Sequence, residues 1–438
     1  MSVVAVVALL GYGLSVPPPA EAGGPLLIGG RFGIPGAPFT WDTSVPIPYR
    51  TDGGNLGPLT NDQANQLVQQ MFQVWQDVPT AAIAYTRLGQ IQGVTGGDVV
   101  TPPDFNAVAC PQSGPGSGQN PIIYDADGSL FQALGFSSRV IGFAGPQLIS
   151  SLGRIVCALA ALNGKFLLGS PPLLSQDQFA AAFIHEFGHF SGLDHSQINT
   201  NCQTSPTTCG PNSDDVLGLP TMYPILLPVT EPGGVPAQKT LAADDIAWIS
   251  RLYPETVNNP PTQVPFSSTH GTISGKVFFS DGVTHAQGVN VIARNVNAPR
   301  KTAVSVVSGY LYTGDRGQDV TGHLGSRFGS LNPQLAGAFD IPVPTGQYTL
   351  EVEAILSGFT DGSRVGPLDP PIDGHGNTPP GPVGPSFAVT AGSTSTVNIT
   401  LQGTPSRFDA LESATLQQPE PFPLWLREEP GLAVGEAA

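Results

Sequence analysis

Residues 181–195 decide how this chain is interpreted. They read Ala-Ala-Phe-Ile-His-Glu-Phe-Gly-His-Phe-Ser-Gly-Leu-Asp-His. Because a helix turns through about 100° per residue, His185 and His189 lie one turn apart on the same face and can bind one ion. Gly192 can adopt a left-handed conformation, which ends the helix and returns His195 toward the same point. The stretch therefore predicts a metal site with three histidine ligands.

The ligand set also predicts what the metal does. Three imidazoles leave one position of a tetrahedral zinc ion open to water, which is typical of a catalytic site. Zinc lowers the pKa of bound water to about 7, and Glu186 can take the water's proton as a general base. A single histidine in a helix is usually no ligand, but here three of the chain's seven histidines fall within eleven residues. The predicted cofactor is one catalytic Zn²⁺, and the predicted reaction is hydrolysis.

The bulk composition limits the class of protein. The chain has 438 residues, which is enough for two or three domains. Only 11% of them are charged, and 54 glycines and 45 prolines favour loop-rich and β-rich structure over long helices. The net charge of -16 argues against a nucleic-acid partner, which requires a basic surface. Nothing in the sequence fixes the oligomeric state.

The beginning of the chain has the pattern of a secretory signal. Within residues 1–22, an apolar run is followed by prolines and by the small-x-small sequence Ala20-Glu21-Ala22. The run is too short to span a bilayer. A buried or disordered N-terminus is the alternative, because no basic residue precedes the run. We expect an extracellular protein without a transmembrane span, in which residues 23–40 form an extended segment rich in glycine and proline.

Four cysteines favour an exported protein with disulfides. Cys202 and Cys209 flank a loop directly after the histidine motif, and their proximity favours a local bond. Cys110 and Cys157 would then pair with each other. Four cysteines allow three connectivities, so this pairing depends on proximity alone. The alternative, a cysteine zinc site, lacks the CxxC spacing of such sites.

Capping motifs locate the helices of the first part of the chain. Thr60-Asn61-Asp62-Gln63 forms a capping box in front of an apolar stripe at helical spacing. Ser175-Gln176-Asp177-Gln178 forms a second box, so the zinc helix is expected from Gln176 to about Ser191. A further helix is expected over residues 241–253, with Thr240 as its N-cap.

An acidic turn, Asp125-Ala126-Asp127-Gly128, allows two interpretations. The carboxylates of Asp125 and Asp127 could hold Ca²⁺, which prefers oxygen ligands. An ordinary Asx turn explains the same residues, because Asp-Gly pairs are common in turns. The sequence leaves both open.

The pattern changes after residue 254. Residues 255–268 contain three prolines and are expected to form a linker. The following residues, 269–402, alternate between apolar and polar side chains in short runs separated by turn residues, which predicts an antiparallel β-sandwich. Residues 403–438 have no clear periodicity and are expected to form a flexible tail.

The first part resembles the matrixin family of metzincin proteases. His185-Glu186-Phe187-Gly188-His189 and Gly192-Leu193-Asp194-His195-Ser196 are similar to the zinc signature of that family. Thr221-Met222-Tyr223-Pro224 is similar to its Met-turn, which implies that Met222 forms an apolar floor under the zinc. The resemblance implies an α+β metzincin fold for residues 41–254, with a twisted mixed sheet and three main helices. It also implies a secreted zinc endopeptidase that cleaves proteins or peptides.

The resemblance to matrixins also implies which residues line the substrate pocket. It implies that Pro224, Ile225 and Leu226 form the wall of a substrate pocket, and Ala181 would line the primed side with a small side chain. No histidine precedes His185, so the second, structural zinc of animal matrixins has no equivalent ligands here.

The β-sandwich resembles carboxypeptidase regulatory-like or transthyretin-like modules, through Gly271–Asp281, Gly288–Arg294 and Gly337–Tyr348. Such a module is expected to bind an extracellular-matrix or cell-surface ligand. The competing hypothesis is therefore an exported surface or matrix-binding protein whose sandwich carries the function and whose protease domain is vestigial. Removing residues 269–402 is expected to leave the hydrolysis of short peptides intact while altering substrate or surface targeting.

Overall fold

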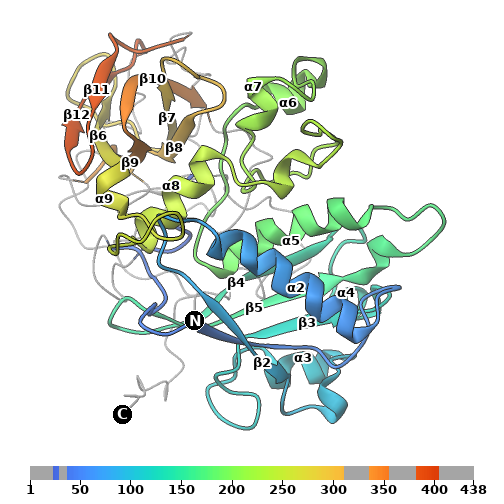
Figure 1. The fold of residues 1–438 in the computed structure, drawn as a ribbon. Helices are drawn as coiled ribbons and strands as arrows, with labels where there is room; N and C mark the ends of the chain where they lie inside the picture. The colour runs from blue at the N-terminus through green and yellow to red at the C-terminus, as the bar shows by residue number, and fades with distance from the viewer. Residues whose placement is uncertain (1–22, 29–36, 310–334, 355–380, 404–438) are drawn as a thin grey trace.

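The computed structural model describes four ranges of the chain, residues 23–28, 37–309, 335–354 and 381–403. Within them, a mixed α/β part is followed by a β-rich part that packs beside it (Figure 1). The predicted signal peptide and the predicted tail beyond residue 403 lie outside the described residues.

The first part is built on a five-stranded sheet with the order β2-β1-β3-β5-β4. Neighbouring strands are parallel except at one edge, where β4 runs antiparallel to β5. Strand β5, which lies between β3 and β4, is an almost entirely apolar and buried run, as expected of a strand covered on both faces. The strands are β1 (Ile47–Thr51), β2 (Tyr85–Gln90), β3 (Pro121–Asp125), β4 (Gly142–Ile149) and β5 (Ile155–Asn163).

Two long helices cover one face of this sheet and lie side by side in Figure 1, α2 and α5. The rings of Phe72 and Phe187 stack between them with centroids 3.9 Å apart, and Trp75 Nε1 donates to the carbonyl of Ile184 over 2.8 Å. The helices of the first part are α2 (Asn61–Gln76), α3 (Pro102–Val108), α4 (Ser129–Ala133), α5 (Gln176–Phe190), α6 (Asn201–Thr204), α7 (Asp214–Leu217) and α8 (Ala243–Leu252).

The helix starts show which predictions hold. Both capping boxes are present, at Thr60 before α2 and at Ser175 before α5. The predicted N-cap Thr240 is wrong, because α8 begins at Ala243. The Asp245 carboxylate of α8 itself accepts the N–H of Ala242 over 2.8 Å, so no hydroxyl side chain is needed in front of the helix.

The predicted linker, residues 255–268, is bonded to the first part rather than free of it. Glu255 N–H donates to Thr80 O over 3.0 Å, and Val264 N–H donates to Pro79 O over 2.8 Å. The segment ends in a short helix, α9 (Phe266–Thr269). It therefore leads directly into the β-rich part with little freedom of its own.

The β-rich part contains two sheets, one with the order β11-β10-β7-β8 and one in which β6 pairs with β9, β12 and β13. Residues 387–400 form three short strands, and two of them pair with β6 in parallel. The prediction of a purely antiparallel sandwich is therefore wrong at this edge. The strands are β6 (His270–Phe278), β7 (Val289–Asn295), β8 (Ala303–Val307), β9 (Ala338–Pro344), β10 (Gly346–Ala354), β11 (Phe387–Val389), β12 (Thr394–Thr396) and β13 (Ile399–Thr400).

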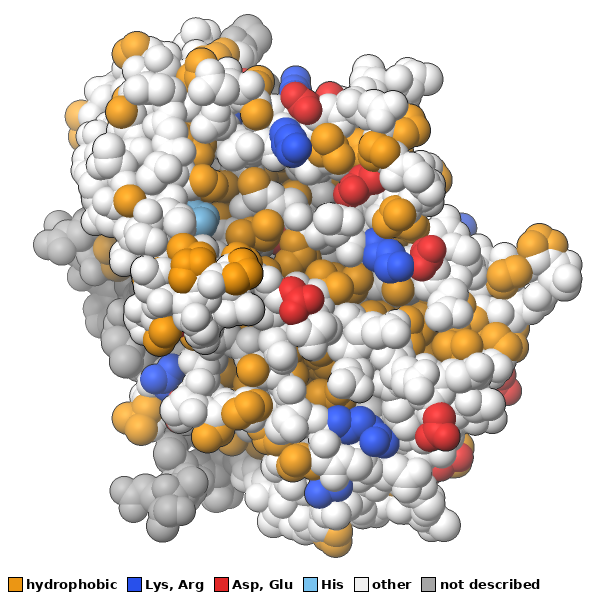
Figure 2. Space-filling view, in the orientation of Figure 1, with side chains coloured by type: hydrophobic (Ala, Val, Ile, Leu, Met, Phe, Trp, Pro, Cys, Tyr) orange, Lys and Arg blue, Asp and Glu red, His pale blue; other side chains and the backbone are white. Residues whose placement is uncertain are grey.

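The two parts share one contiguous cluster of buried apolar side chains. On the face shown in Figure 2, charged side chains are scattered singly among apolar and uncharged ones, as 11% charge would suggest. Among the described helices, none combines the length and the apolar character needed to cross a membrane.

Candidate metal centre

Helix α5 presents the first two histidines of the motif on one face. The rings of His185 and His189 have centroids 4.7 Å apart and are nearly perpendicular, at 89°. Each residue is only 8% exposed. The helix ends at Phe190, and Gly192 follows with a left-handed φ of 91°. Leu193 N–H then donates to the carbonyl of Gly188 over 2.9 Å, which closes the helix end and turns the chain.

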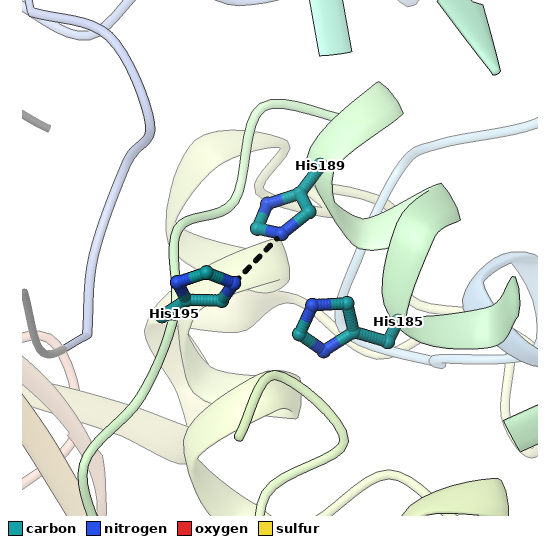
Figure 3. Close-up of side chains that lie close together, drawn as sticks. All are labelled: His185, His189 and His195. Carbon is teal, nitrogen blue, oxygen red and sulfur yellow. Dashed lines mark hydrogen bonds between the residues drawn. The ribbon is translucent and has the colours of Figure 1, made fainter. Parts of the chain in front are cut away.

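The turn brings His195 back to the helix. Its Nε2 lies 3.1 Å from Nε2 of His189, and the three rings face a common point in Figure 3. One ring nitrogen from each histidine lies within 4.8 Å of the others. Three ligands at about 2.0 to 2.1 Å from a tetrahedral zinc lie about 3.4 Å apart, so this set of nitrogens fits such an ion with small adjustments.

Burial keeps the three rings neutral. It lowers the pKa of His185 to about 3, with the neighbouring His189 adding a smaller effect, and it lowers the pKa of His189 to about 4. The pKa of His195 is also well below its ordinary value, first through burial and then through the other two histidines. Neutral imidazoles keep a lone pair for a metal, so the donor chemistry of the cluster suits zinc.

Hydrogen bonds fix which nitrogen faces the common point in two of the rings. His185 Nδ1 lies 2.8 Å from Thr221 O, and His189 Nδ1 lies 2.8 Å from Leu193 O. A carbonyl can only accept, so each Nδ1 carries the proton and each Nε2 keeps its lone pair. His195 Nδ1 has no such acceptor among the described residues.

The predicted floor residue lies directly against the zinc helix. Met222 is buried, and a Cβ added at Gly188 would come within 2.2 Å of its sulfur. The turn is held by Asp245, whose carboxylate accepts the N–H groups of Thr221 and Met222 over 2.8 and 3.0 Å. Burial raises the pKa of Asp245 to about 6, although these hydrogen bonds to the carboxylate act to lower it. The sequence predicts a helix over residues 241–253 but gives no signal for this role of Asp245.

The N-terminal segment also contacts the site, which sequence reasoning did not predict. Pro25 forms a bridge with Leu193, and Leu26 N–H donates to Gly192 O over 2.8 Å. Gly23 N–H donates to the carbonyl of His195. Residues 23–28 therefore lie along the chain between the helix end and the third histidine. An apolar, proline-containing pattern gave no signal for this pairing.

Glu186 follows His185 in α5 and is partly buried, whereas the three histidines are buried. Ala181 is fully buried one turn earlier, and residues 224–226 are partly exposed after the Met-turn. The roles of Glu186 as base, and of Ala181, Pro224, Ile225 and Leu226 as pocket residues, stay predictions.

The acidic turn has the bonds of an Asx turn. Asp125 is buried, and its carboxylate accepts the N–H groups of Gly128 and Phe131 over 2.9 and 2.8 Å at the start of α4. Asp127 accepts from Ser129 N–H over 3.0 Å. These bonds explain the residues without an ion, and calcium binding stays a prediction.

Both predicted disulfides are present. Cys110 pairs with Cys157, and Cys202 pairs with Cys209. The first bond joins the end of α3 to β5, and the second closes the loop that includes α6. No cysteine is left free.

Comparisons with known proteins add little. No protein-family model matches the chain, and no curated protein matches it. Similar solved structures include the TIE protein of Bacillus anthracis (10% identity, TM-score 0.17, 31% of this chain and 17% of that one). They also include the major pilin subunit BcpA of Bacillus cereus (12% identity, TM-score 0.17, 31% of this chain and 31% of that one). A third is the minor pilin GBS52 of Streptococcus agalactiae (14% identity, TM-score 0.16, 32% of this chain and 46% of that one). The chain spans less than half the length of each, and TM-scores this low carry no argument about fold or function.

Proposed function

We propose that this protein is a secreted zinc-dependent endopeptidase of the matrixin type. The observation that carries the proposal is the convergence of three buried, neutral imidazoles, two of them from a helix that also bears Glu186. The two disulfides are compatible with an extracellular protein. The mixed sheet, the helices α2, α5 and α8, and the turn at Met222 support a metzincin-type first part.

Each residue of the site would have its own role in peptide hydrolysis. His185, His189 and His195 would hold the zinc through Nε2 of each ring. When bound, zinc supplies a water of lowered pKa and a positive charge where the oxyanion develops. Glu186 would act as the general base and acid, accepting a proton from the attacking water and passing it to the leaving amine. Met222, which is buried against α5 at Gly188, would form the apolar floor of the site.

An edge strand supports an extended polypeptide as the substrate. Strand β4 is the last strand of the first sheet, and its outer edge has no strand partner among the described residues. It packs tightly on α5, because a Cβ added at Gly142 would come within 2.5 Å of the Phe183 ring. The last strand of a sheet, lying beside the metal helix, can bond the main chain of an extended peptide, which favours cleavage within polypeptides.

Replacing Glu186 tests the proposal most directly. Glu186→Ala and Glu186→Gln are expected to retain zinc and to lose about 100- to 10,000-fold in the rate of peptide cleavage, the range typical of a general base. Asp177→Asn is the matched control, because Asp177 is an exposed acid in the first turn of the same helix. Cleavage that is equal in the Glu186 variants and in the control would remove Glu186 from the mechanism.

A further inference from the structure

Residues 194–199, which we call the third-ligand segment, carry the chain away from the metal centre. Every residue of the segment is at most 6% exposed. The segment is neither helix nor strand, and Asn199 adopts a left-handed φ of 55°, which asparagine tolerates better than most residues. A buried segment without regular structure depends on its neighbours for its shape.

The ring of His195 has less support than the other two rings. The Nδ1 atoms of His185 and His189 are each held by a main-chain carbonyl. Within the described part of the chain, Nδ1 of His195 has no hydrogen-bond partner. Hydrogen bonds to the outer nitrogen normally orient a metal-ligating histidine. The position of His195 therefore depends on the main chain of the third-ligand segment.

Strand β7 of the second part bonds to this segment across a long sequence distance. Asn290 Nδ2 donates to Gln197 O over 2.8 Å, and Arg294 Nη1 donates to Asn199 Oδ1 over 3.2 Å. These partners are 93 and 95 residues apart in the chain. The contacts hold both the main chain and a side chain of the segment.

Arg294 is itself fixed from the other side. Its side chain is 2% exposed and is paired with Glu351 and Glu353 of β10. Asn199 completes the contact by donating from Nδ2 to Arg300 O over 2.8 Å. The end of the third-ligand segment is thus bonded on two sides to the second part.

Apolar and main-chain contacts extend the same interface. Ile198 packs with Ile292 and Ala303 in a small buried cluster. On β8, Ser305 N–H donates to Asp244 Oδ1 over 2.8 Å, and Trp248 Nε1 donates to Ser305 O over 2.9 Å. Figure 1 shows this end of the second part against α8. The interface therefore contacts both α8 and the third-ligand segment.

We propose that the β7–β8 face of the second part positions His195 and is needed for full metal affinity. The inference rests on the proposed zinc site and adds positioning residues to it, above all Asn290 and Arg294. It reverses the expectation that the second part can be removed without effect on hydrolysis. Removing the face would take away the bond from Asn290 to Gln197 O and the bonds of the Asn199 side chain to Arg294 and Arg300, and would leave that side chain its bond to Asp215 O over 3.0 Å.

Three variants of the full chain test this role. Asn290→Leu keeps the branched shape of the side chain and removes the bond to Gln197, and Arg294→Lys keeps the charge but loses the planar fork. In Asn199→Gly the new glycine can adopt the left-handed φ without strain. The substitution removes the side-chain contacts without altering the second part. Ser308→Ala is the control, because Ser308 is equally buried but its hydroxyl bonds within the second part, donating to Ala286 O over 2.8 Å and accepting from Val289 N–H over 3.1 Å.

Zinc affinity is measured by competition with a chromophoric chelator, and the visible absorption of the cobalt-substituted protein reports the ligand geometry. The three variants are expected to lose about 10- to 100-fold in zinc affinity, as replacements of outer partners of metal ligands do, and to change the cobalt spectrum. Ser308→Ala is expected to match the wild type in both. The inference is wrong if Asn199→Gly, and those second-part variants that fold, keep the zinc affinity and the cobalt spectrum of the wild type. That result would leave the proposed zinc site standing. A wild type that binds neither metal overturns the proposed function as well.

Discussion

The first two predicted ligands, His185 and His189, are held in a different way from the third, His195. His185 and His189 stand on α5, where a capping box begins the helix and main-chain carbonyls orient both rings. His195 stands on a segment without regular structure, which is bonded to the N-terminal segment, the Met-turn and the second part. The site therefore joins a pair of ligands encoded locally to a ligand whose position is encoded by residues far along the chain.

The packing of α5 on the Met-turn is the strongest test of the helical pair. In Gly188→Ala the new Cβ would come within 2.2 Å of the Met222 sulfur and 2.9 Å of the Trp75 ring. Such overpacking is expected to destabilise the protein by about 1 to 3 kcal/mol, measured by urea unfolding. Gly210→Ala is the control, because a Cβ there meets nothing within 4 Å. Equal stability of the two variants would show that α5 does not rest tightly on Met222.

A change at the helix end tests the third ligand separately. Gly192 has a φ of 91°, so Gly192→Ala is expected to cost about 1 to 2 kcal/mol of stability and to weaken zinc binding by displacing His195. Gly233→Ala is a matched control, since Gly233 has a similar φ of 88° and open space around it. It is expected to show a similar backbone cost with unchanged zinc affinity. Equal zinc affinity in both variants would contradict the role given to this turn.

We expect the smallest effect on stability, and one that depends on pH, from the contact between α8 and the second part. Burial, and then the nearby Asp245, raise the pKa of Asp244 from 3.8 to about 8. The folded state therefore keeps a proton that the unfolded state releases, so the contribution of Asp244 to stability is full below pH 3.8 and is lost as the pH rises toward 8. Asp244→Asn retains an acceptor for Ser305 N–H without the charge.

We expect Asp244→Asn to be more stable than the wild type at pH 8, with a smaller difference or none near pH 4. Urea unfolding of both proteins at the two pH values measures this change. A wild type that gains stability relative to the variant as the pH rises would show that Asp244 is charged and well paired in the folded protein.

The same comparison shows how far the sequence predicts the site. The spacing of His185, His189 and His195 predicts their convergence, because one helical turn and one glycine suffice to bring them together. Local caps and the Cys202–Cys209 bond are predictable for the same reason, since their partners are close in sequence. The structure also shows a mixed sheet, as the family resemblance implies, and a β-rich second part, as the alternating pattern predicts.

Contacts between distant residues were not predictable from patterns. Asp245 bonds to N–H groups 23 and 24 residues earlier, and Asn290 bonds to a carbonyl 93 residues earlier. Neither has a spacing rule, because the intervening fold alone brings the partners together. The residues that look like a linker, 255–268, are bonded to the first part for the same reason. Proline content indicates a break in regular structure and does not indicate freedom of movement.

The central claim is that the histidine cluster binds one catalytic zinc. Its most direct test is to measure the zinc content of the purified full chain together with its cleavage of a peptide library, with and without a chelator. We predict one zinc per chain, cleavage that the chelator abolishes, and recovery when zinc is added back. A chain that binds no zinc, or that cleaves equally well with the chelator present, would contradict the account.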